Sequence, residues 1–348
     1  MNPYVLTIFL LSLGLGTTIT FSSSHWLLAW MGLEINTLAI LPLMAQHHHP
    51  RAVEATTKYF LAQATAAATI LFASSMNAWT TGQWNIDYSS NQASTILIMT
   101  ALALKIGLAP MHFWMPSVLQ GLDLTTGLVM STWQKLAPFA LIVQIAPFTN
   151  PTLLMMLGLT STMVGGWGGL NQTQLRKILA YSSIAHLGWM IIILQLQPKL
   201  TILTLMIYVI MTSTAFLTFK FLMTTKVNML TTTWSNTPMI TMTTMLALLS
   251  LGGLPPLTGF MPKWLILQEL AKQQLPLTAT IIAISALLSL YFYLRLTYAM
   301  TLTVSPNTNN ASTPWRLMNN QLTLPLTLLS TMTLMLLPIT PAIQALIY

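Results

Sequence analysis

The chain has 348 residues, of which 54% are hydrophobic and 5% are charged, with a formal net charge of +8 and no cysteine. A soluble domain carries about 25% charged residues, so this composition excludes a water-soluble protein and predicts an integral membrane protein. The 13 basic residues are scattered among apolar runs, whereas nucleic-acid-binding proteins cluster them on one face, so no nucleic-acid partner is expected. Without cysteine, the chain forms no disulfide and ligates no iron–sulfur cluster.

Along the chain, eleven apolar segments approach the length of about 20 residues that crosses a bilayer. They cover 3–21, 25–45, 56–78, 94–115, 124–146, 150–171, 175–195, 199–222, 238–268, 276–300 and 322–345. The ninth is too long for one straight span. We therefore predict an all-α polytopic membrane protein with about eleven transmembrane helices.

Two segments carry the same signature of a broken helix, near 107–116 and near 252–262. When Gly107 is aligned with Gly253, the stretches match at Gly, Leu, Pro, Met and Pro over ten positions. Glycine and proline interrupt the helical hydrogen-bond ladder, and an interrupted backbone at membrane depth must line a protein or water-filled cavity. Paired breaks at matching points of two halves indicate the transport site of a repeat-built transporter.

The two glycines are five predicted segments apart. Because five is an odd number, the second copy enters the membrane with the opposite sense, which predicts an inverted repeat. The predicted organisation is a first five-helix repeat over 1–149 and a second over 150–302, followed by a polar connector and a final transmembrane helix over 303–348.

Charged residues are divided unequally between the two predicted membrane sides. The side that holds the N-terminus has Arg51, Lys58, Arg176, Lys177, Lys226, Arg295 and Arg316, and the other side has Lys199, Lys272, Asp87 and Glu269. By the positive-inside rule, the first side is the cytoplasm, or the matrix if the membrane is mitochondrial. An odd number of spans places the C-terminus on the opposite side.

Four charged residues lie too deep to reach water. Glu34 lies about nine residues into its span, and Lys105 and Lys135 about eleven, which at ~1.5 Å per residue is about 14–17 Å deep in a core ~30 Å thick. Lys263 follows the second break. A charge at mid-depth costs at least about 2.5–3.5 kcal/mol, so such groups pair, neutralise or contact internal water. Two interpretations remain open: a proton relay, or a fixed Glu34–Lys105 ion pair that only joins two helices.

Histidines offer further candidates. His112 lies in the first break and His186 lies mid-span, and either can relay protons because histidine titrates near neutral pH. A hydrogen-bonded core histidine is an equally good interpretation of both. The tract His47-His48-His49 has no acidic cluster nearby, so we expect no metal site there.

Several runs closely resemble the chain 2 family of mitochondrial NADH–ubiquinone oxidoreductase (respiratory complex I). These runs are His25-Trp26, Gly32-Leu33-Glu34, Lys58-Tyr59-Phe60-Leu61, Trp133-Gln134-Lys135-Leu136-Ala137-Pro138, Trp167-Gly168-Gly169-Leu170-Asn171-Gln172-Thr173, Arg176-Lys177-Ile178-Leu179-Ala180-Tyr181-Ser182-Ser183 and Leu251-Gly252-Gly253-Leu254-Pro255-Pro256-Leu257-Thr258-Gly259-Phe260. The resemblance is collinear over the whole length. It implies an antiporter-like fold and a proton-pumping subunit of this enzyme, with Glu34, Lys105, Lys135 and Lys263 forming a charged axis along the membrane midplane.

The resemblance also implies the location and the partners. The chain is expected in the mitochondrial inner membrane, with its N-terminus in the matrix and its C-terminus in the intermembrane space. Its expected partners are lipids and the other membrane-arm and accessory subunits of complex I, including further antiporter-like subunits. NADH, FMN, iron–sulfur clusters and ubiquinone are implied on partner subunits, with no cofactor in this chain. The alternatives are a stand-alone cation/proton antiporter subunit and a passive scaffold between pumping neighbours.

Overall fold

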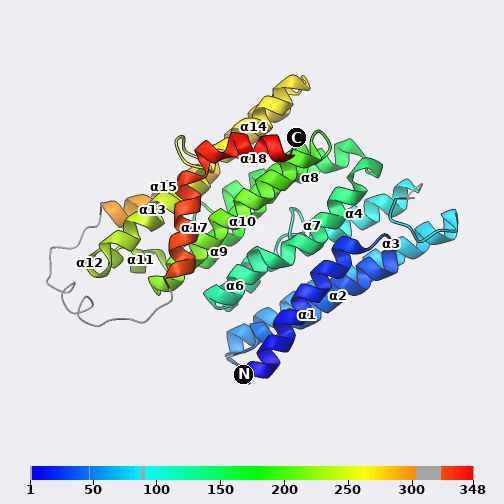
Figure 1. Cartoon of the computed structure of the whole chain (residues 1–348), viewed down its shortest axis with the longest axis horizontal. Coiled ribbons are helices and arrows are strands. Elements are labelled where there is room, and N and C mark those ends of the chain that lie inside the picture. The colour runs from blue at the N-terminus through cyan, green and yellow to red at the C-terminus, as the bar shows by residue number, and fades with distance from the viewer. Residues whose placement is uncertain (1, 47, 88–90, 303–322, 348) are drawn as a thin grey trace. The chain divides into compact units, whose positions relative to one another are not determined.

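The computed structural model describes residues 2–46, 48–87, 91–302 and 323–347, and its elements are labelled in Figure 1. The chain divides into two compact units, Met1–Ser161 and Thr162–Tyr348. The polar connector predicted at the start of 303–348 falls almost wholly outside the described residues, as do His47 and Arg316.

Helices make up the first unit. They are α1 (Pro3–Ser22), α2 (Trp26–Met44), α3 (Pro50–Thr81), α4 (Gln92–Ile106), α5 (Trp114–Gly121), α6 (Leu124–Ser131), α7 (Trp133–Ile145), the short 3-10 turn η1 (Ala146–Phe148) and the start of α8 (Pro151–Gly168). Helices α1 and α2 lie side by side (Figure 1). A Cβ added to Gly16 would lie 2.9 Å from the carbonyl oxygen of Gly32, so glycine brings these two backbones together.

The second unit is also helical. Its elements after α8 are α9 (Leu175–Leu194), α10 (Pro198–Phe221), α11 (Val227–Leu230), α12 (Thr233–Asn236), α13 (Pro238–Gly252), α14 (Phe260–Lys272), α15 (Pro276–Thr301), α17 (Leu324–Met335), η3 (Leu337–Ile339) and α18 (Thr340–Ile347). Near its end, α8 packs closely on α9 and α15. A Cβ on Gly165 would lie 2.6 Å from the amide nitrogen of Ala185, and one on Gly166 would lie 3.0 Å from the carbonyl oxygen of Ser285.

Each of the eleven predicted segments is occupied by helix in the structure. Seven of the described helical stretches are long and apolar enough to span a membrane when 124–148, which covers α6, α7 and η1, is taken as one, and a pair at 324–345, bent by 62°, is an eighth candidate. Helices α4 and α13 are apolar but shorter, because each is one half of a broken segment. The all-α membrane fold is therefore confirmed, whereas the count of eleven spans stays a prediction.

Both predicted breaks are present, and they share one backbone geometry. Gly107 follows α4 with φ +85° and Gly253 follows α13 with φ +79°, a left-handed conformation that glycine adopts at little cost. In each break the glycine N–H donates to carbonyls three and four residues back, and the next residue, Leu108 or Leu254, donates to the carbonyl five back. The helices resume at the aligned positions Trp114 and Phe260, so the sequence alignment of the two stretches is also a structural one.

A third interruption was not predicted. The segment 124–146 was expected to be one helix, but it divides at Thr132 into α6 and α7. Thr132 has φ −113° and ψ −72°, and its hydroxyl donates to the carbonyl oxygen of Leu128 at 2.7 Å. Lys135 consequently lies in the first turn of α7, directly after a break, and Pro138 lies within the same helix.

Connections predicted to share a membrane side meet within each unit. In the first unit, His25 pairs with Asn85 at one end, and at the other a Cβ on Gly121 would lie 2.6 Å from the carbonyl oxygen of Arg51. In the second unit, Gln174 pairs with Lys226. These contacts support the alternating direction of the spans within each unit.

Arg295 lies within the predicted segment 276–300 and belongs to α15. Its guanidinium donates to the carbonyl oxygen of Gln172 at 2.5 Å and also to that of Leu170. It therefore fixes the α8–α9 connection, on the side to which the charge pattern assigned it.

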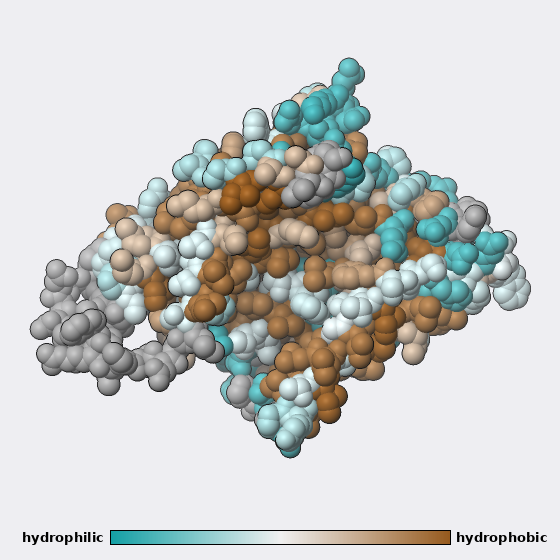
Figure 2. All heavy atoms as spheres, viewed as in Figure 1, coloured by the Kyte–Doolittle hydropathy of each residue, from teal (hydrophilic) through white to brown (hydrophobic). Residues whose placement is uncertain are grey.

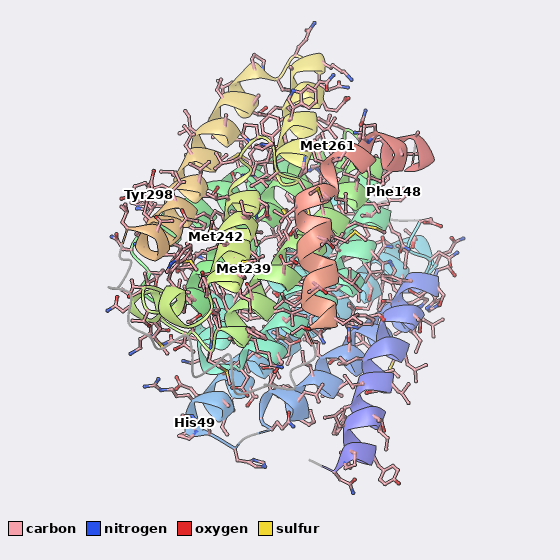
Figure 3. All side chains as sticks on the ribbon, turned by 60° about the vertical axis from the view of Figure 1, so that its left-hand side comes forward. His49, Phe148, Met239, Met242, Met261 and Tyr298 are labelled. Atoms are coloured by element: carbon pink, nitrogen blue, oxygen red, sulfur yellow. The ribbon has the colours of Figure 1, made fainter. Side chains whose placement is uncertain are left out.

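Apolar side chains remain exposed along the helices. Figure 2 shows them on the outward face of α1, while hydrophilic side chains gather near the tip of α14. In the second unit, Met239 and Met242 of α13 and Tyr298 of α15 are exposed (Figure 3). Such surfaces suit lipid or a partner helix.

Candidate functional site

Two of the predicted lysines line one small cavity in the first unit. The cavity has a volume of about 10 Å³ and is lined from α2, α3, α4, α6 and α7 by Leu33, Asn36, Thr37, Tyr59, Gln63, Lys105, Ile106, Met130, Gln134, Lys135 and Pro138. A single water needs roughly 10–15 Å³ and two to four polar partners. The cavity therefore matches one water in both size and chemistry.

Both lysines are deeply buried, Lys105 at 5% exposure and Lys135 at 3%. Lys105 lies in the last turn of α4, before the predicted break, and its Nζ has no hydrogen-bond partner among the described residues. A buried amine without a protein partner is costly unless water reaches it. Each lysine lies within three residues of a helix break, at Gly107 or Thr132, and both line the cavity.

Two side-chain amides, the buried Gln63 and the half-buried Gln134, fix the walls of the cavity. Gln63 of α3 donates from Nε2 to the carbonyl oxygen of Lys105 at 3.2 Å. Gln134 of α7 donates from Nε2 to the backbone oxygen of Asn36 at 3.3 Å and to its Oδ1 at 3.4 Å. Each bond joins helices far apart in sequence, so the backbones that carry the lysines are held against α2 and α3.

Glu34 contacts the cavity through Thr37. Thr37 lines the cavity, and its hydroxyl donates to Oε2 and to the backbone oxygen of Glu34, each at 2.9 Å. Among the described residues, no nitrogen–oxygen contact within 4 Å joins Glu34 to Lys105, although the carboxylate is near enough to interact electrostatically with that amine. The structure therefore does not contain the Glu34–Lys105 contact pair, which was one of the two interpretations that the sequence left open.

Lys263 lies in a second cavity, within the second unit. This cavity is about 20 Å³ and is lined by His186, Trp189, Met190, Thr204, Tyr208, Met211, Gly259, Pro262, Lys263 and Ile266. The Lys263 amine donates to the carbonyl oxygen of Gly252 at 2.7 Å, which is a carbonyl of the broken helix that precedes it. The His186 ring lies 5.7 Å from that of Tyr208. The predicted lysine and one predicted histidine are thus brought together.

The second break is also held by a helix outside the predicted repeats. The Thr258 hydroxyl donates to the carbonyl oxygen of Thr333 in α17 at 2.7 Å, and both residues are buried. In the first break, His112 is buried and its ring lies 4.4 Å from that of Phe113. It does not line the cavity that holds Lys105. No group of three or more potential metal ligands occurs among the described residues, which include His48 and His49.

Sequence reasoning missed the uncharged residues of both cavities. Asn36, Tyr59, Gln63 and Gln134 all lie inside apolar segments, and Thr204 and Tyr208 do so in the second unit. A signal was present, because a polar side chain in a membrane span faces the protein interior and finds a hydrogen-bond partner there.

Comparison with known proteins agrees with this architecture. A family model described as NADH:quinone oxidoreductase/Mrp antiporter, TM, matches residues 23–289, and one described as NADH dehydrogenase subunit 2 C-terminus matches 290–344. The structure of respiratory complex I from Thermus thermophilus with bound aureothin contains a similar chain, with a TM-score of 0.82, 28% identity, and coverage of 97% of this chain and 80% of that one. A chain of the Mrp complex from Dietzia sp. has the same fold, with a TM-score of 0.81 at 16% identity, over 97% of this chain and 75% of that one.

Relatives of nearly the same length as this chain are much more similar to it in sequence than the chains of those solved structures. NADH-ubiquinone oxidoreductase chain 2 of Carassius auratus is 72% identical over 346 residues, 99% of each chain. The protein of the same name from Formosania lacustris is 71% identical over 348 residues, all of both chains. The chain therefore belongs to the NADH-ubiquinone oxidoreductase chain 2 family.

Proposed function

We propose that the chain is a core membrane subunit of NADH:ubiquinone oxidoreductase, respiratory complex I, and that it translocates protons across the mitochondrial inner membrane through Glu34, Lys105, Lys135 and Lys263. Membership of the chain 2 family supports the place in the enzyme. The observation that carries the relay is the cavity shared by Lys105 and Lys135, because two buried amines beside a water-sized space form a proton donor and acceptor.

The proposed step moves one proton between the two lysines. The Lys105 ammonium gives its proton to a water in the cavity, and that water passes a proton to the neutral Lys135 amine. Charge then moves from α4 to α7 while the water is regenerated. The Glu34 carboxylate attracts positive charge to Lys105 from a distance, so it favours loading of the first lysine without holding it in a contact pair.

The second unit contributes a second loading site. The Lys263 amine, held by the Gly252 carbonyl, shares its cavity with His186 and Tyr208. An imidazole can take up and release a proton near neutral pH. His186 is therefore the proposed proton exchanger for Lys263, and His112 is a weaker candidate because it lies outside both cavities.

The redox chemistry is assigned to partner subunits. NADH, FMN, iron–sulfur clusters and ubiquinone bind there, and this chain contributes proton transfer to the enzyme. Other membrane-arm and accessory subunits, antiporter-like ones among them, are its partners. A stand-alone cation/proton antiporter is the alternative, since one matching family model also covers Mrp antiporters. After gentle solubilisation, the chain should co-migrate with flavin and iron–sulfur proteins, whereas an antiporter would migrate without them.

The proposed orientation places the N-terminus in the matrix and the C-terminus in the intermembrane space, with inverted repeats over 1–149 and 150–302. The matched breaks and the charge asymmetry support this arrangement. Because the chain has no cysteine, single cysteines report sidedness cleanly. In sealed mitoplasts, an impermeant maleimide should label Ser24→Cys and should label Thr173→Cys, close to Arg176, only after detergent is added. Labelling of Thr173→Cys in sealed mitoplasts would show that the orientation is opposite to the one proposed.

Glu34→Gln tests the counter-charge. The amide keeps the size and the hydrogen bond from Thr37, but it removes the negative charge that faces Lys105. We expect the complex to assemble, since a neutral Lys105 amine is tolerated in the cavity. Proton translocation should slow several-fold, because protonation of Lys105 becomes less favourable without the negative charge. The measurement is NADH-driven acidification in reconstituted vesicles. Wild-type rate and stoichiometry in this variant would remove Glu34 from the relay, and Glu54→Gln, at an exposed ion pair with Lys58, is the matched control.

A further inference from the structure

We propose that helix α17 is part of the proton site in the second unit, and that Thr258 positions Lys263 by joining the second break to this helix. The contact between them is the hydrogen bond from the Thr258 hydroxyl to the carbonyl oxygen of Thr333, at 2.7 Å between residues that are 1% and 2% exposed. The role of Thr258 rests on the proposed function of Lys263, because a positioning residue acts only through the group that it positions.

The accepting carbonyl belongs to the last turn of α17. The helix ends at Met335, and the chain then bends by 62° into the next helical segment. Carbonyl groups in the last turn of an α-helix have no N–H donor further along that helix, and a buried carbonyl without a donor is costly. The Thr258 hydroxyl supplies a donor to the carbonyl of Thr333. One bond therefore stabilises both the end of α17 and the second break.

Thr258 is also connected to the start of the helix that carries Lys263. The backbone N–H of Met261, in the first turn of α14, donates to the carbonyl oxygen of Thr258 at 3.3 Å. Lys263 follows in α14, and its amine reaches back across the break to the carbonyl oxygen of Gly252 at 2.7 Å. This reach depends on where α14 begins, so a displacement of Thr258 would move the lysine away from its acceptor.

Helix α17 packs on two helices that border the Lys263 cavity. It lies across α13 and α10 (Figure 1). The break follows α13, and α10 contributes Thr204, Tyr208 and Met211 to the cavity. The other side of α17 is exposed, at Leu324, Leu328, Met332 and Met335. One face of this helix thus supports the site, while the opposite face is free for lipid.

The first break has a comparable connection. The Thr160 hydroxyl of α8, which donates to the carbonyl oxygen of Met156 at 2.8 Å, also lies 3.3 Å from the carbonyl oxygen of Ala109 in that break. Helix α8 follows the first predicted repeat, and α17 follows the second. Each break is therefore joined through a threonine hydroxyl to the helix that comes after its own predicted repeat. This recurrence favours a role for α17 in the site itself.

The test compares three substitutions in the intact purified complex in sealed vesicles. Thr258→Val removes the hydroxyl, Thr258→Ser keeps it, and Thr333→Val keeps the accepting carbonyl but removes a side-chain hydroxyl that bonds to the carbonyl oxygen of Ser330. Thr258→Val should lower the rate of proton translocation per assembled complex about fivefold, the change in an equilibrium constant that loss of one average hydrogen bond produces. It should also speed hydrogen exchange in the peptide 253–261. Thr258→Ser and Thr333→Val should match the wild type in both measurements.

Three results would overturn the role of Thr258. Unchanged hydrogen exchange in Thr258→Val would show that α17 does not hold the break. Faster exchange with wild-type translocation would show that the break is held without positioning Lys263. Equal losses in Thr258→Val and Thr333→Val would assign the effect to the general packing of α17.

Lys263→Met, measured alongside, separates this role from the function on which it rests. Loss of translocation in Lys263→Met together with a normal Thr258→Val variant would reject the role of Thr258 alone. Wild-type translocation in Lys263→Met would reject both. If Thr258→Val does not assemble, Thr258→Ala is judged by the same results, because its smaller side chain leaves room for a water at the Thr333 carbonyl.

Discussion

Replacing Gly259 with alanine is expected to prevent assembly of the complex. A Cβ at this position would overlap the backbone carbonyl oxygen of Ser250, lie 2.8 Å from the carbonyl carbon and lie 3.1 Å from the sulfur of Met211. Backbone on both sides of the second break would have to separate, at a cost above the ~1–3 kcal/mol usual for overpacking. The measurement is the amount of assembled complex on a native gel.

Gly14→Ala provides the matched control. Its added Cβ meets no atom within 4 Å, and alanine in the middle of a helix is more stable than glycine by roughly 0.5–1 kcal/mol. Assembly of this variant should equal that of the wild type. Normal assembly of Gly259→Ala would show that the second break does not pack as described.

Lys135→Met is expected to leave an assembled complex that has lost coupled activity. Methionine keeps the apolar stem and removes the amine, and replacing a buried charge by an apolar group of similar size is often neutral or stabilising by about 1–4 kcal/mol. A positioned proton donor or acceptor contributes roughly 10²–10⁴-fold, so we expect coupled ubiquinone reduction to fall by at least about tenfold. Assembly is followed on native gels and activity as NADH oxidation in sealed vesicles.

Lys220→Met is the control for this variant. Lys220 is exposed in the last turn of α10, so its amine reaches the interface and its loss should leave both assembly and turnover unchanged. A passive scaffold predicts that the two variants behave alike. Wild-type turnover and proton yield in Lys135→Met would support that scaffold interpretation.

The sequence predicted the helices and both breaks because those features are local. The length of an apolar segment indicates a transmembrane span, and glycine and proline indicate where the helical hydrogen bonds are interrupted. Gly107 and Gly253 could therefore be identified without knowledge of any tertiary contact. The depths of Lys105 and Lys135 followed from counting residues. The bend at 336–339 was not predicted, although Pro338 lies within it.

The contacts that complete the cavities were not predictable in the same way. Gln134 bonds to Asn36, Gln63 to the Lys105 carbonyl and Thr258 to that of Thr333. Each of these bonds joins separate helices, and no periodicity or spacing within one segment specifies its partner. Depth alone likewise does not decide whether two charges touch, which is why the sequence left the Glu34–Lys105 ion pair open.

The central claim is that Lys105 and Lys135 act on the same proton in one pathway. The most direct test measures protons translocated per NADH oxidised, and their rate, in vesicles that contain Lys105→Met, Lys135→Met or both changes. Residues that act as a unit show strongly non-additive losses. We predict that each single variant and the double variant lose translocation to the same extent. Wild-type translocation in either single variant, or a double variant whose loss is the product of the two single losses, would contradict a shared relay.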